Sequence, residues 1–497
     1  MFMHSASHIF KAFHEHSLIY CHWKSNEHLG EGLRGETDLD VLVSHDQSAE
    51  CGKLLRETGF RQVYSPPWAQ YPGIEDWLGF DQTTGKSLHI HLHYRLLVGR
   101  KFVKEIHLPW AEYVLRTRVM DPATGVYVAD PNIELILLAL RIGIKTRWST
   151  LLIAMLSGRM VIPKNIHAEI SYLLHHSEAE KIKICCETFF NSKSAEKVVD
   201  AIECLRKKHT PRHILRLMML SRSILARYRR FSLSRAFLQY VVRTVWLRSA
   251  RILKRFGANI QTKKNLGADN GLVIAVLGAD GAGKSTLVLK MHEWLSWKLE
   301  ARVLYLGRHW LFRILERIRH AIEKTPSART NATKTTGKGR QRSLIRTLVS
   351  DIRKLLNAYG RHTAVQKMLR FKKQGYVVVT DRFPQMQFCG INDSPSIQAG
   401  SAHSRIHHVF RRIELRLYKQ MCAVPPDIVI KLHVSEETAV TRKPDHHAKT
   451  IAVKADIVRR LAFTNSVAID IDTDGVSADE VALQTKVALW KHVAHTV

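Results

Sequence analysis

The residues with the clearest chemistry form a glycine-rich loop between an apolar, β-branched run and a helical pattern. The loop consists of Gly278, Ala279, Asp280, Gly281, Ala282, Gly283, Lys284, Ser285 and Thr286. Its glycines allow successive backbone N–H groups to point at one anion, and the start of the following helix adds partial positive charge. We expect Lys284 to reach the β- and γ-phosphates of ATP and Ser285 to hold Mg²⁺.

A second pair of candidate residues follows the β-branched run 376–380. Asp381 and Arg382 stand at the carboxyl end of this predicted strand, where ligands bind in open parallel sheets. Asp381 is a candidate ligand of Mg²⁺ or of its waters. The planar guanidinium of Arg382 is suited to binding a phosphoryl group.

A separate group of acids and histidines lies far upstream. Asp38 and Asp40 project to one face if residues 38–43 are extended, because side chains alternate along a strand. Two such carboxylates are suited to a divalent metal and would repel each other without a cation. His89, His91 and His93 also alternate, which allows either a zinc-type site or an ordinary polar sheet face.

The elements that position these residues divide the chain of 497 residues into several parts, because this length exceeds one ordinary core. We predict an α/β protein: an α+β domain at 1–129, a basic helical region at 130–257, a linker at 258–270 and an α/β domain with a parallel sheet at 271–497. Pro131 marks a predicted helix start, and further helices are expected near 167–176, 179–190 and 194–205.

The net charge of +32 calls for an anionic partner. Residues 206–256 carry fifteen Lys or Arg and no Asp or Glu, with apolar residues at helical spacing. This block fits an anionic membrane surface or an acidic protein partner, and equally helices that pack their apolar faces and leave arginines in solvent. Nucleic acid is not favoured, because no reader motif is present. Scattered cysteines and the absence of a signal-peptide pattern predict a cytoplasmic protein, peripheral at the inner membrane face if the basic block binds lipid.

Residues 271–497 resemble thymidylate kinase and its relatives among the P-loop nucleoside monophosphate kinases. The resemblance rests on the loop 278–286, on Asp381-Arg382-Phe383, and on the strand end 434–439 with the basic segment that follows it. It implies a three-layer α/β/α domain that binds ATP and Mg²⁺ and a nucleotide or phosphorylated small molecule. It also implies that Asp280 contacts the acceptor's sugar, that Asp381 and Arg382 handle the acceptor phosphate and the metal, and that Arg442 and Lys443 are lid cations.

The N-terminal part resembles the nucleotidyltransferase fold of the DNA polymerase β superfamily. Lys24-Ser25 correspond to its small-residue turn and Asp38-Leu39-Asp40 to its acidic pair. His91 stands where that family places a third carboxylate, and imidazole is a poorer Mg²⁺ ligand than carboxylate. The resemblance therefore implies a degenerate domain that binds a nucleotide or sugar phosphate, or that uses another metal.

Three hypotheses follow. The first is an ATP- and Mg²⁺-dependent kinase acting on a nucleotide or sugar-type acceptor. The second is a nucleotidyltransferase working through Asp38 and Asp40 with a regulatory P-loop domain. The third is an ATP-switched binding protein that docks on a membrane-bound polysaccharide assembly through the basic helices. The order of the two domains resembles that of proteins encoded with bacterial surface-polysaccharide pathways.

Overall fold

The computed structural model describes residues 6–157, 162–207, 210–256, 258, 260–307, 336–398, 405–443 and 448–495. These residues form two compact units, one within residues 6–264 and the other within residues 265–492. Within the predicted linker, Leu266 and Asp269 donate backbone hydrogen bonds of 2.9 Å to Gly375 and Lys373. The second unit therefore begins before residue 271, because residues 265–270 are tied to the turn that precedes a strand of its sheet.

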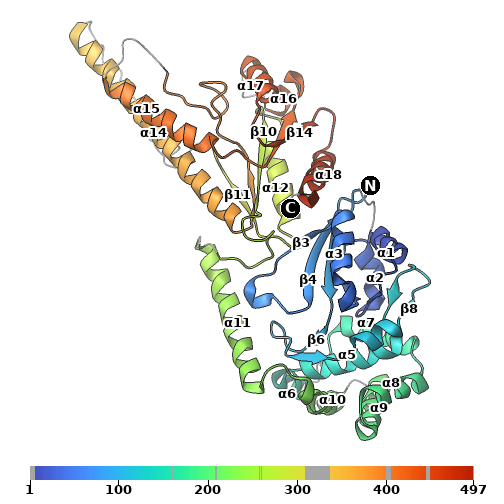
Figure 1. The fold of residues 1–497 in the computed structure, drawn as a ribbon. Helices are drawn as coiled ribbons and strands as arrows, with labels where there is room; N and C mark the ends of the chain where they lie inside the picture. Colours follow the sequence, from blue (N-terminus) through green and yellow to red (C-terminus); the bar gives the residue numbers. More distant parts are fainter. Residues whose placement is uncertain are drawn as a thin grey trace. The chain divides into compact units, whose positions relative to one another are not determined.

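The first unit contains a seven-stranded mixed sheet of order β3-β4-β5-β2-β1-β9-β8 (Figure 1). Its strands are β1 (Tyr20–His22), β2 (Leu39–Val43), β3 (Arg61–Val63), β4 (Ile74–Phe80), β5 (Ser87–His93), β8 (Val119–Met120) and β9 (Tyr127–Val128). A separate two-stranded sheet joins β6 (Leu96–Val98) to β7 (Ile106–Leu108). The accompanying helices are α1 (Ala6–Glu15), α2 (Leu29–Leu33), α3 (Ser48–Glu57) and α4 (Ala111–Arg116), with short 3-10 turns η1 (Asn26–His28), η2 (His45–Gln47) and η3 (Pro67–Ala69).

Strand β2 separates an apolar face from a polar one. Leu39, Val41 and Val43 are buried in a core that also contains the apolar side chains of α1 and α3. The alternating positions Asp38 and Asp40 therefore project to the opposite face, as the period of a strand requires. The expectation that these two acids share one face is confirmed, because both approach the same imidazole, that of His91.

Helices follow the sheet within the same unit. They are α5 (Pro131–Lys145), α6 (Trp148–Ser157), α7 (Lys164–His175), α8 (Ala179–Phe189), α9 (Ser192–Lys207), α10 (Pro211–Ile224) and α11 (Leu233–Arg255), with η4 (Leu225–Tyr228) between the last two. The predicted start at Pro131 is confirmed, and Asp130 accepts a hydrogen bond of 2.8 Å from the backbone of Asn132. One continuous core joins residues of β1 and β2 to α5, α7, α8, α9 and α10. Among the described helices, none combines the length and apolar character needed to cross a bilayer.

The second unit is built on a five-stranded parallel sheet of order β11-β12-β10-β13-β14. Its strands are β10 (Leu272–Gly278), β11 (Ala301–Leu304), β12 (Val377–Thr380), β13 (Ile428–His433) and β14 (Val467–Asp472). Its helices are α12 (Lys284–Leu295), α14 (Thr336–Lys373), α15 (Arg405–Cys422), α16 (Glu436–Arg442), α17 (Ala448–Arg460) and α18 (Ala478–His495). The predicted parallel α/β architecture of this region is confirmed.

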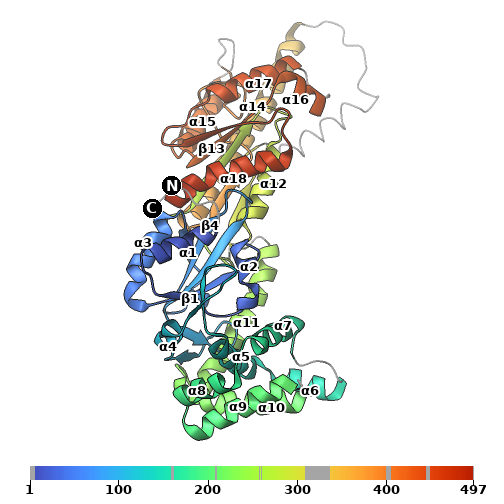
Figure 2. The same ribbon diagram turned by 90° about the vertical axis from the view of Figure 1, so that its right-hand side faces the viewer.

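Both faces of the central strand β10 are buried, which explains its unbroken apolar sequence. Val273, Ala275 and Leu277 share a core with side chains of α14, α15 and α17. Helices α12 and α18 pack together through the rings of Trp294 and Trp490, whose centroids are 6.1 Å apart (Figure 2). Burial of both strand faces leaves the loop after β10 at the carboxyl edge of the sheet, where ligands bind in this class of fold.

Candidate nucleotide-binding site and an acid–histidine cluster

The loop between β10 and α12 has the backbone that its glycines predict. Gly281 and Gly283 adopt φ values of +89° and +84°, in the left-handed region that favours glycine. A Cβ atom at Gly281 would lie 2.8 Å from the carbonyl oxygen of Ala439, so α16 packs directly against the loop. The loop is therefore curled where it leads into α12, and a curled backbone of this kind can direct several N–H groups at one anion.

Lys284 lies within this curl. Its Nζ donates a hydrogen bond of 2.6 Å to the carbonyl oxygen of Ala279, and its side chain lines a small cavity beside the loop. Burial, followed by the neighbouring charge of Arg382, lowers the pKa of Lys284 to about 8. A lysine in this setting gains from an incoming phosphate, because the anion offsets both the desolvation and the repulsion.

Asp381 and Arg382 follow β12 and line the same cavity as Asp280 and Lys284. Burial raises the pKa of Asp381 even though Arg382 opposes the shift. Its Oδ1 atom is buried without a hydrogen-bond partner among the described residues. A buried carboxylate oxygen of this kind suits Mg²⁺ or its waters, because Mg²⁺ prefers oxygen ligands. The residues present therefore fit the metal.

Two residues that line this cavity, Lys454 and Asp393, were not anticipated from the sequence. Lys454 of α17 places Nζ 2.5 Å from Oδ2 of Asp280. Asp393 forms two ion pairs: its Oδ2 lies 3.5 Å from the guanidinium of Arg382, and its Oδ1 lies 2.6 Å from that of the buried Arg361. Neither lies next to a recognisable motif, and only the packing of α14 and α17 onto the sheet brings them to the loop.

A second cavity lies on the other side of the loop. It is lined by Ala282, Gly283, Thr286, Leu287, Arg442, Thr473, Val476, Ala478 and Val481. The guanidinium of Arg442 donates hydrogen bonds of 2.8 Å to the carbonyl oxygen of Thr473 and 3.5 Å to that of Gly281. The lining of this cavity combines apolar side chains with polar backbone groups, and such a lining is suited to a planar ring.

The predicted lid cations therefore occupy different places. Arg442 is bound at this second cavity, on the side of the loop away from Asp280. Lys443 lies close enough to Lys284 to contribute, after burial and Arg382, to its lowered pKa. Residues 444–447, which belong to the predicted basic segment, lie outside the described residues.

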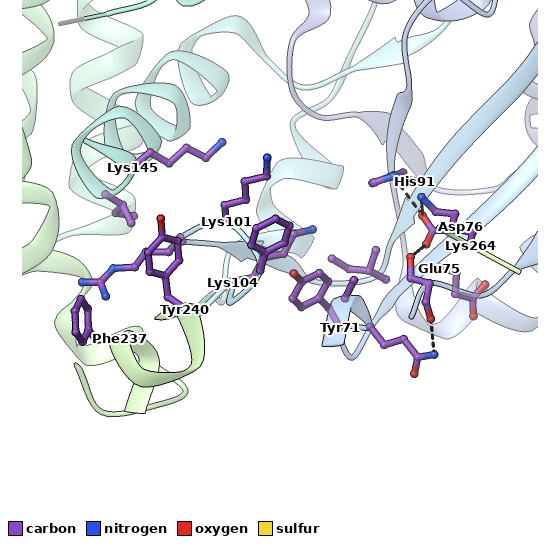
Figure 3. A pocket seen from close by; sticks show the side chains of 18 of the residues that line it. Tyr71, Glu75, Asp76, His91, Lys101, Lys104, Lys145, Phe237, Tyr240 and Lys264 are labelled. Carbon is purple, nitrogen blue, oxygen red and sulfur yellow. Dashed lines mark hydrogen bonds and ion pairs between the residues drawn. The ribbon is translucent and has the colours of Figure 1, made fainter. Parts of the chain in front are cut away.

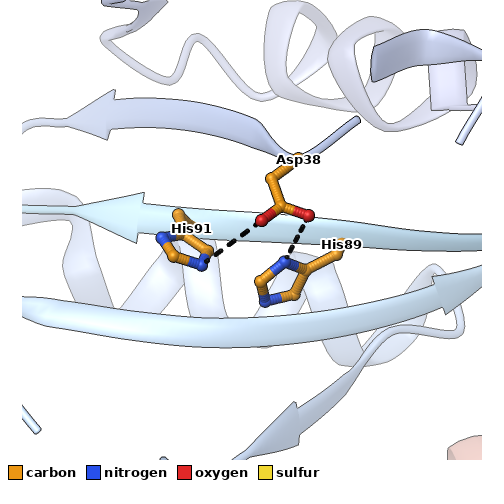
Figure 4. Close-up of side chains that lie close together, drawn as sticks. All are labelled: Asp38, His89 and His91. Carbon is orange, nitrogen blue, oxygen red and sulfur yellow. Dashed lines mark ion pairs between the residues drawn. The ribbon is translucent and has the colours of Figure 1, made fainter. Parts of the chain in front are cut away.

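The first unit brings Asp38, Asp40 and His91 together, as the sequence predicted. Figure 4 shows the Asp38 carboxylate between the rings of His89 and His91. His91 places Nε2 3.9 Å from Asp38 and Nδ1 3.8 Å from Asp40. The buried His89 places Nδ1 2.9 Å from Asp38. Asp38, His89 and His91 offer ligand atoms that all lie within 4.8 Å of one another, as do Asp40, His91 and His93.

A third carboxylate, missed from the sequence, completes this cluster. Asp76 of β4 is paired with His91 of β5 in the antiparallel register, and its Oδ1 lies 3.2 Å from Nε2 of His91. It lies 3.3 Å from Nε2 of His89 and 3.7 Å from Lys264. The acid is supplied by the strand beside His91 rather than by the position of His91. Residues 74–80 do not alternate between apolar and polar types, so no pattern in the sequence indicated this acid.

Ser25 does not join this cluster. Its hydroxyl donates a hydrogen bond of 3.4 Å to Glu169, whereas the adjacent Lys24 places Nζ 2.7 Å from Asp40. The predicted turn therefore supplies an ammonium group, not a hydroxyl, to the acidic pair. Ser25 itself has a left-handed backbone, at φ +57°.

The pKa values in this cluster favour a charged carboxylate beside neutral imidazoles. Burial opposes ionisation of Asp40, but Lys24 and the hydrogen bond from His93 hold the pKa of that carboxyl well below its ordinary value. Burial lowers the pKa of His91 well below its ordinary value and that of His93 to about 4. Ionised carboxylates beside neutral imidazoles can bind a divalent metal through both oxygen and nitrogen.

The fold and the loop geometry define a P-loop protein with a parallel α/β sheet. No family model matches the sequence. The uncharacterized ATP-binding protein YghR of Escherichia coli K12 is 30% identical over 218 residues, which are 40% of this chain and 80% of that protein. The chain belongs to the family of YghR.

Two other proteins are similar to this chain. The uncharacterized ATP-binding protein YghS of Escherichia coli K12 is 28% identical over 209 residues, or 40% of this chain and 85% of that protein. Thymidylate kinase from Ehrlichia chaffeensis matches at 17% identity over 44% of this chain and 98% of its own, with a TM-score of 0.26.

Proposed function

We propose that the protein is an ATP- and Mg²⁺-dependent phosphotransferase whose acceptor is a nucleotide or a sugar-type molecule. The observation that carries the proposal is the convergence of Asp280, Lys284, Asp381 and Arg382 on one cavity at the phosphate-binding loop. The description of YghR and YghS as ATP-binding proteins supports the nucleotide part of the proposal.

Each part of the loop region has a distinct task in this proposal. The backbone N–H groups of residues 279–284 and the start of α12 bind the phosphates, and Lys284 neutralises charge on the phosphoryl group that is transferred. Mg²⁺, when bound by Ser285 and Asp381, would neutralise phosphate charge and orient the phosphates. The cavity beside Arg442 and Thr473 receives the base of ATP.

The opposite cavity receives the acceptor. Arg382 and Lys454 can bind an anionic group there, and Asp280 can accept a hydrogen bond from an acceptor hydroxyl. Asp393 orients Arg382 through its ion pair. A polar acceptor that carries both an anionic group and hydroxyls matches this mixture of charges. Phosphoryl transfer in such a site depends on positioning and charge neutralisation rather than on a covalent intermediate.

The test is a screen of the purified chain with γ-labelled ATP and Mg²⁺ against nucleoside monophosphates and sugar precursors. We expect one acceptor class to become labelled, and Lys284→Ala to abolish the labelling. Lys419→Ala, which removes an exposed lysine from α15, is the charge-matched control and retains activity. If no acceptor is labelled and Lys284→Ala binds ATP as tightly as the unmodified chain, the proposal is wrong.

A second candidate function is nucleotidyl transfer in the first unit. The observation that favours it is the third carboxylate, Asp76, beside Asp38 and His91. Under this alternative, incubation with α-labelled nucleoside triphosphates transfers label to an acceptor. The double variant Asp38→Asn, Asp40→Asn abolishes that transfer and leaves γ-phosphoryl transfer unchanged, whereas Lys284→Ala has the reverse effect.

A further inference from the structure

The first unit contains a cavity of about 1170 Å³ that neither proposed reaction uses as a whole (Figure 3). It extends from the Asp76–His91 pair to side chains of α6 and α11. The volume exceeds what a phosphate group alone would fill and is at the upper end for small-molecule sites. The cavity therefore has room for a ligand with a charged group and a large second part.

One wall is a loop, residues 99–105, with an unusual backbone. Gly99, Phe102 and Lys104 all have φ between +45° and +133°. Such conformations persist only where the surroundings hold them, and they concentrate at functional sites. Here the buried Glu105 accepts a hydrogen bond of 2.8 Å from the backbone of Arg100. The guanidinium of Arg243, on α11, donates to the carbonyl oxygen of Phe102. The loop is thus fixed in place and tied to α11.

The charge of the cavity is uneven. Its lining contains two acids, Glu75 and Asp76, and seven cations: Arg100, Lys101, Lys104, Lys145, Arg147, Arg222 and Lys264. Glu75 accepts a hydrogen bond of 2.9 Å from the Trp77 ring, and Asp76 is bound by His91 and Lys264. Within the described part of the chain, no carboxylate lies at ion-pair distance from Lys101, Lys104 or Lys145.

These lysines act on one another. Burial, followed by the nearby charges of Lys24 and Lys145, which Asp40 and Asp76 oppose, lowers the pKa of Lys104 to about 8. In Figure 3 the amino groups of Lys101 and Lys145 point toward the same part of the cavity, between the Tyr240 ring and the His91–Asp76 pair. An anion in this place would face both ammonium groups and offset the cost of their burial in the cavity.

The far wall is aromatic and continues into an exposed apolar surface. Phe237 and Tyr240 of α11 line the cavity, and Arg147 lies over the Tyr240 ring at 5.4 Å. From the cavity-lining Phe237, exposed apolar side chains continue along the adjoining edge of α11 at a spacing of four residues and form the α11 stripe: Phe237 (59%), Val241 (37%) and Val245 (57%). Such a stripe beside a basic cavity is suited to an apolar chain attached to a charged group.

From these features we propose that the first unit binds an amphiphilic phosphate ester. Its phosphate group is bound by Lys101, Lys104 and Lys145, and its apolar chain lies along the α11 stripe. The excess of cations over acids in the cavity selects the anionic group, and the exposed side chains of α11 select the chain. Neither a free phosphate nor an uncharged amphiphile satisfies both parts.

Titration calorimetry of the full chain with three probes tests this proposal: dodecyl phosphate below its micellar concentration, inorganic phosphate and dodecyl maltoside. We expect dodecyl phosphate to bind and the other two to bind at least tenfold more weakly, since each lacks one of the two groups of contacts. If inorganic phosphate or dodecyl maltoside binds as tightly as dodecyl phosphate, the protein does not require both groups, and the proposal of an amphiphilic phosphate ester is wrong. If dodecyl phosphate does not bind, the proposed site does not exist.

Variants assign the two contacts separately. Lys104→Gln with Lys145→Gln should weaken dodecyl phosphate binding by about tenfold or more, as loss of charge-assisted hydrogen bonds predicts. Val241→Ser with Val245→Ser, both exposed and therefore tolerated by the fold, should weaken it as well. Lys193→Gln with Lys197→Gln removes the same charge from exposed positions of α9 and should change nothing. If this control weakens binding as much, the attraction is general charge and the proposal fails.

The source of the amphiphile is distinguished with phosphatidylcholine vesicles that contain or lack phosphatidic acid. Co-sedimentation that depends on phosphatidic acid, on Lys104 and Lys145, and on the α11 stripe indicates a lipid bound at the bilayer surface. Binding of dodecyl phosphate without co-sedimentation indicates an amphiphile bound outside a bilayer. Both results support the site. Co-sedimentation that the cavity variant leaves unchanged shows attraction of the basic helices alone and contradicts it.

Discussion

Lys454 places its ammonium nitrogen 2.5 Å from Oδ2 of Asp280, the acid inside the phosphate-binding loop. Burial alone would raise the pKa of Asp280, but the hydrogen bond and charge of Lys454 hold it below its ordinary value. The loop therefore carries an ionised acid whose charge is balanced from α17. This balance matters because an unpaired carboxylate in the loop would repel the phosphates that the same loop binds.

Replacement of Lys454 should weaken nucleotide binding although no motif contains it. In Lys454→Ala, the negative charge of Asp280 is left uncompensated beside the phosphates. We expect ATP to bind about tenfold more weakly, a loss of about 1.4 kcal/mol, measured by calorimetry. Lys449→Ala removes an exposed lysine from the same helix and serves as the control. An unchanged affinity in Lys454→Ala would show that the pair has no part in binding.

Nucleotide binding should depend on pH through Lys284. Because burial and Arg382 lower the pKa of Lys284 to about 8, the side chain is protonated below that pH and loses its proton above it. ATP should therefore bind more weakly as the pH rises above 8, with uptake of a proton in that range, since bound phosphate favours the charged form. Calorimetry in buffers of different ionisation enthalpy measures this uptake. Lys284→Arg, which stays charged, should lose the dependence, and an equally steep dependence in that variant would contradict the assignment.

Asp76 should stabilise the first unit as well as complete its cluster. This carboxylate is 9% exposed and faces His89, His91 and Lys264. Asp76→Asn removes the negative charge that faces Lys264 and the carboxylate that both imidazoles approach, which should cost about 3 kcal/mol. Faster hydrogen exchange of the β4 and β5 amides in the full chain measures the loss. Asp46→Asn, at an exposed position, is the control. Exchange rates in Asp76→Asn equal to those of the control would show that the charges are not coupled.

Glu134 should make the stability of the first unit fall as the pH rises. Burial raises its pKa to about 8, with Asn26 donating hydrogen bonds of 3.2 Å and 2.5 Å to its oxygens. Between the ordinary glutamate pKa, about 4.3, and 8, the folded chain retains a proton that the unfolded chain releases, so the free energy of unfolding decreases across this range. Glu134→Gln should remove this slope in denaturation series at both ends of the range. A slope that persists in the variant would assign it to other groups.

Much of the second unit follows from local sequence. The β-branched run 272–277 predicts a strand buried on both faces, and the glycines of the loop predict its curl, because each depends on residues adjacent in the chain. The carboxyl end of β12 could likewise be located from its apolar run, which places Asp381 and Arg382 at the edge of the sheet. The period-two pattern around Asp38 and Asp40 correctly placed both acids on one face.

Contacts across long intervals could not be predicted in this way. Lys454 lies in an ordinary amphipathic helix, and nothing in its neighbours indicates that α17 brings it to Asp280. Asp76 meets His91 because β4 and β5 pair antiparallel in a particular register, which a shift of one residue would destroy. Lys24 reaches Asp40 whereas Ser25 contacts Glu169, more than a hundred residues further along the chain.

The sequence by itself thus determined the phosphate-binding loop and the parallel α/β architecture around it. It also determined the two groups of candidate site residues, one at the loop and one among the acids and histidines of the first unit. Spacing along the chain is sufficient for these features, since they depend on the periods of strand and helix and on the freedom of glycine. The tertiary structure decided which charges meet. It paired Asp280 with Lys454, supplied Asp76 to the histidines and joined the loop at Phe102 to α11, because electrostatic partners are set by distance in space and not by position in the sequence.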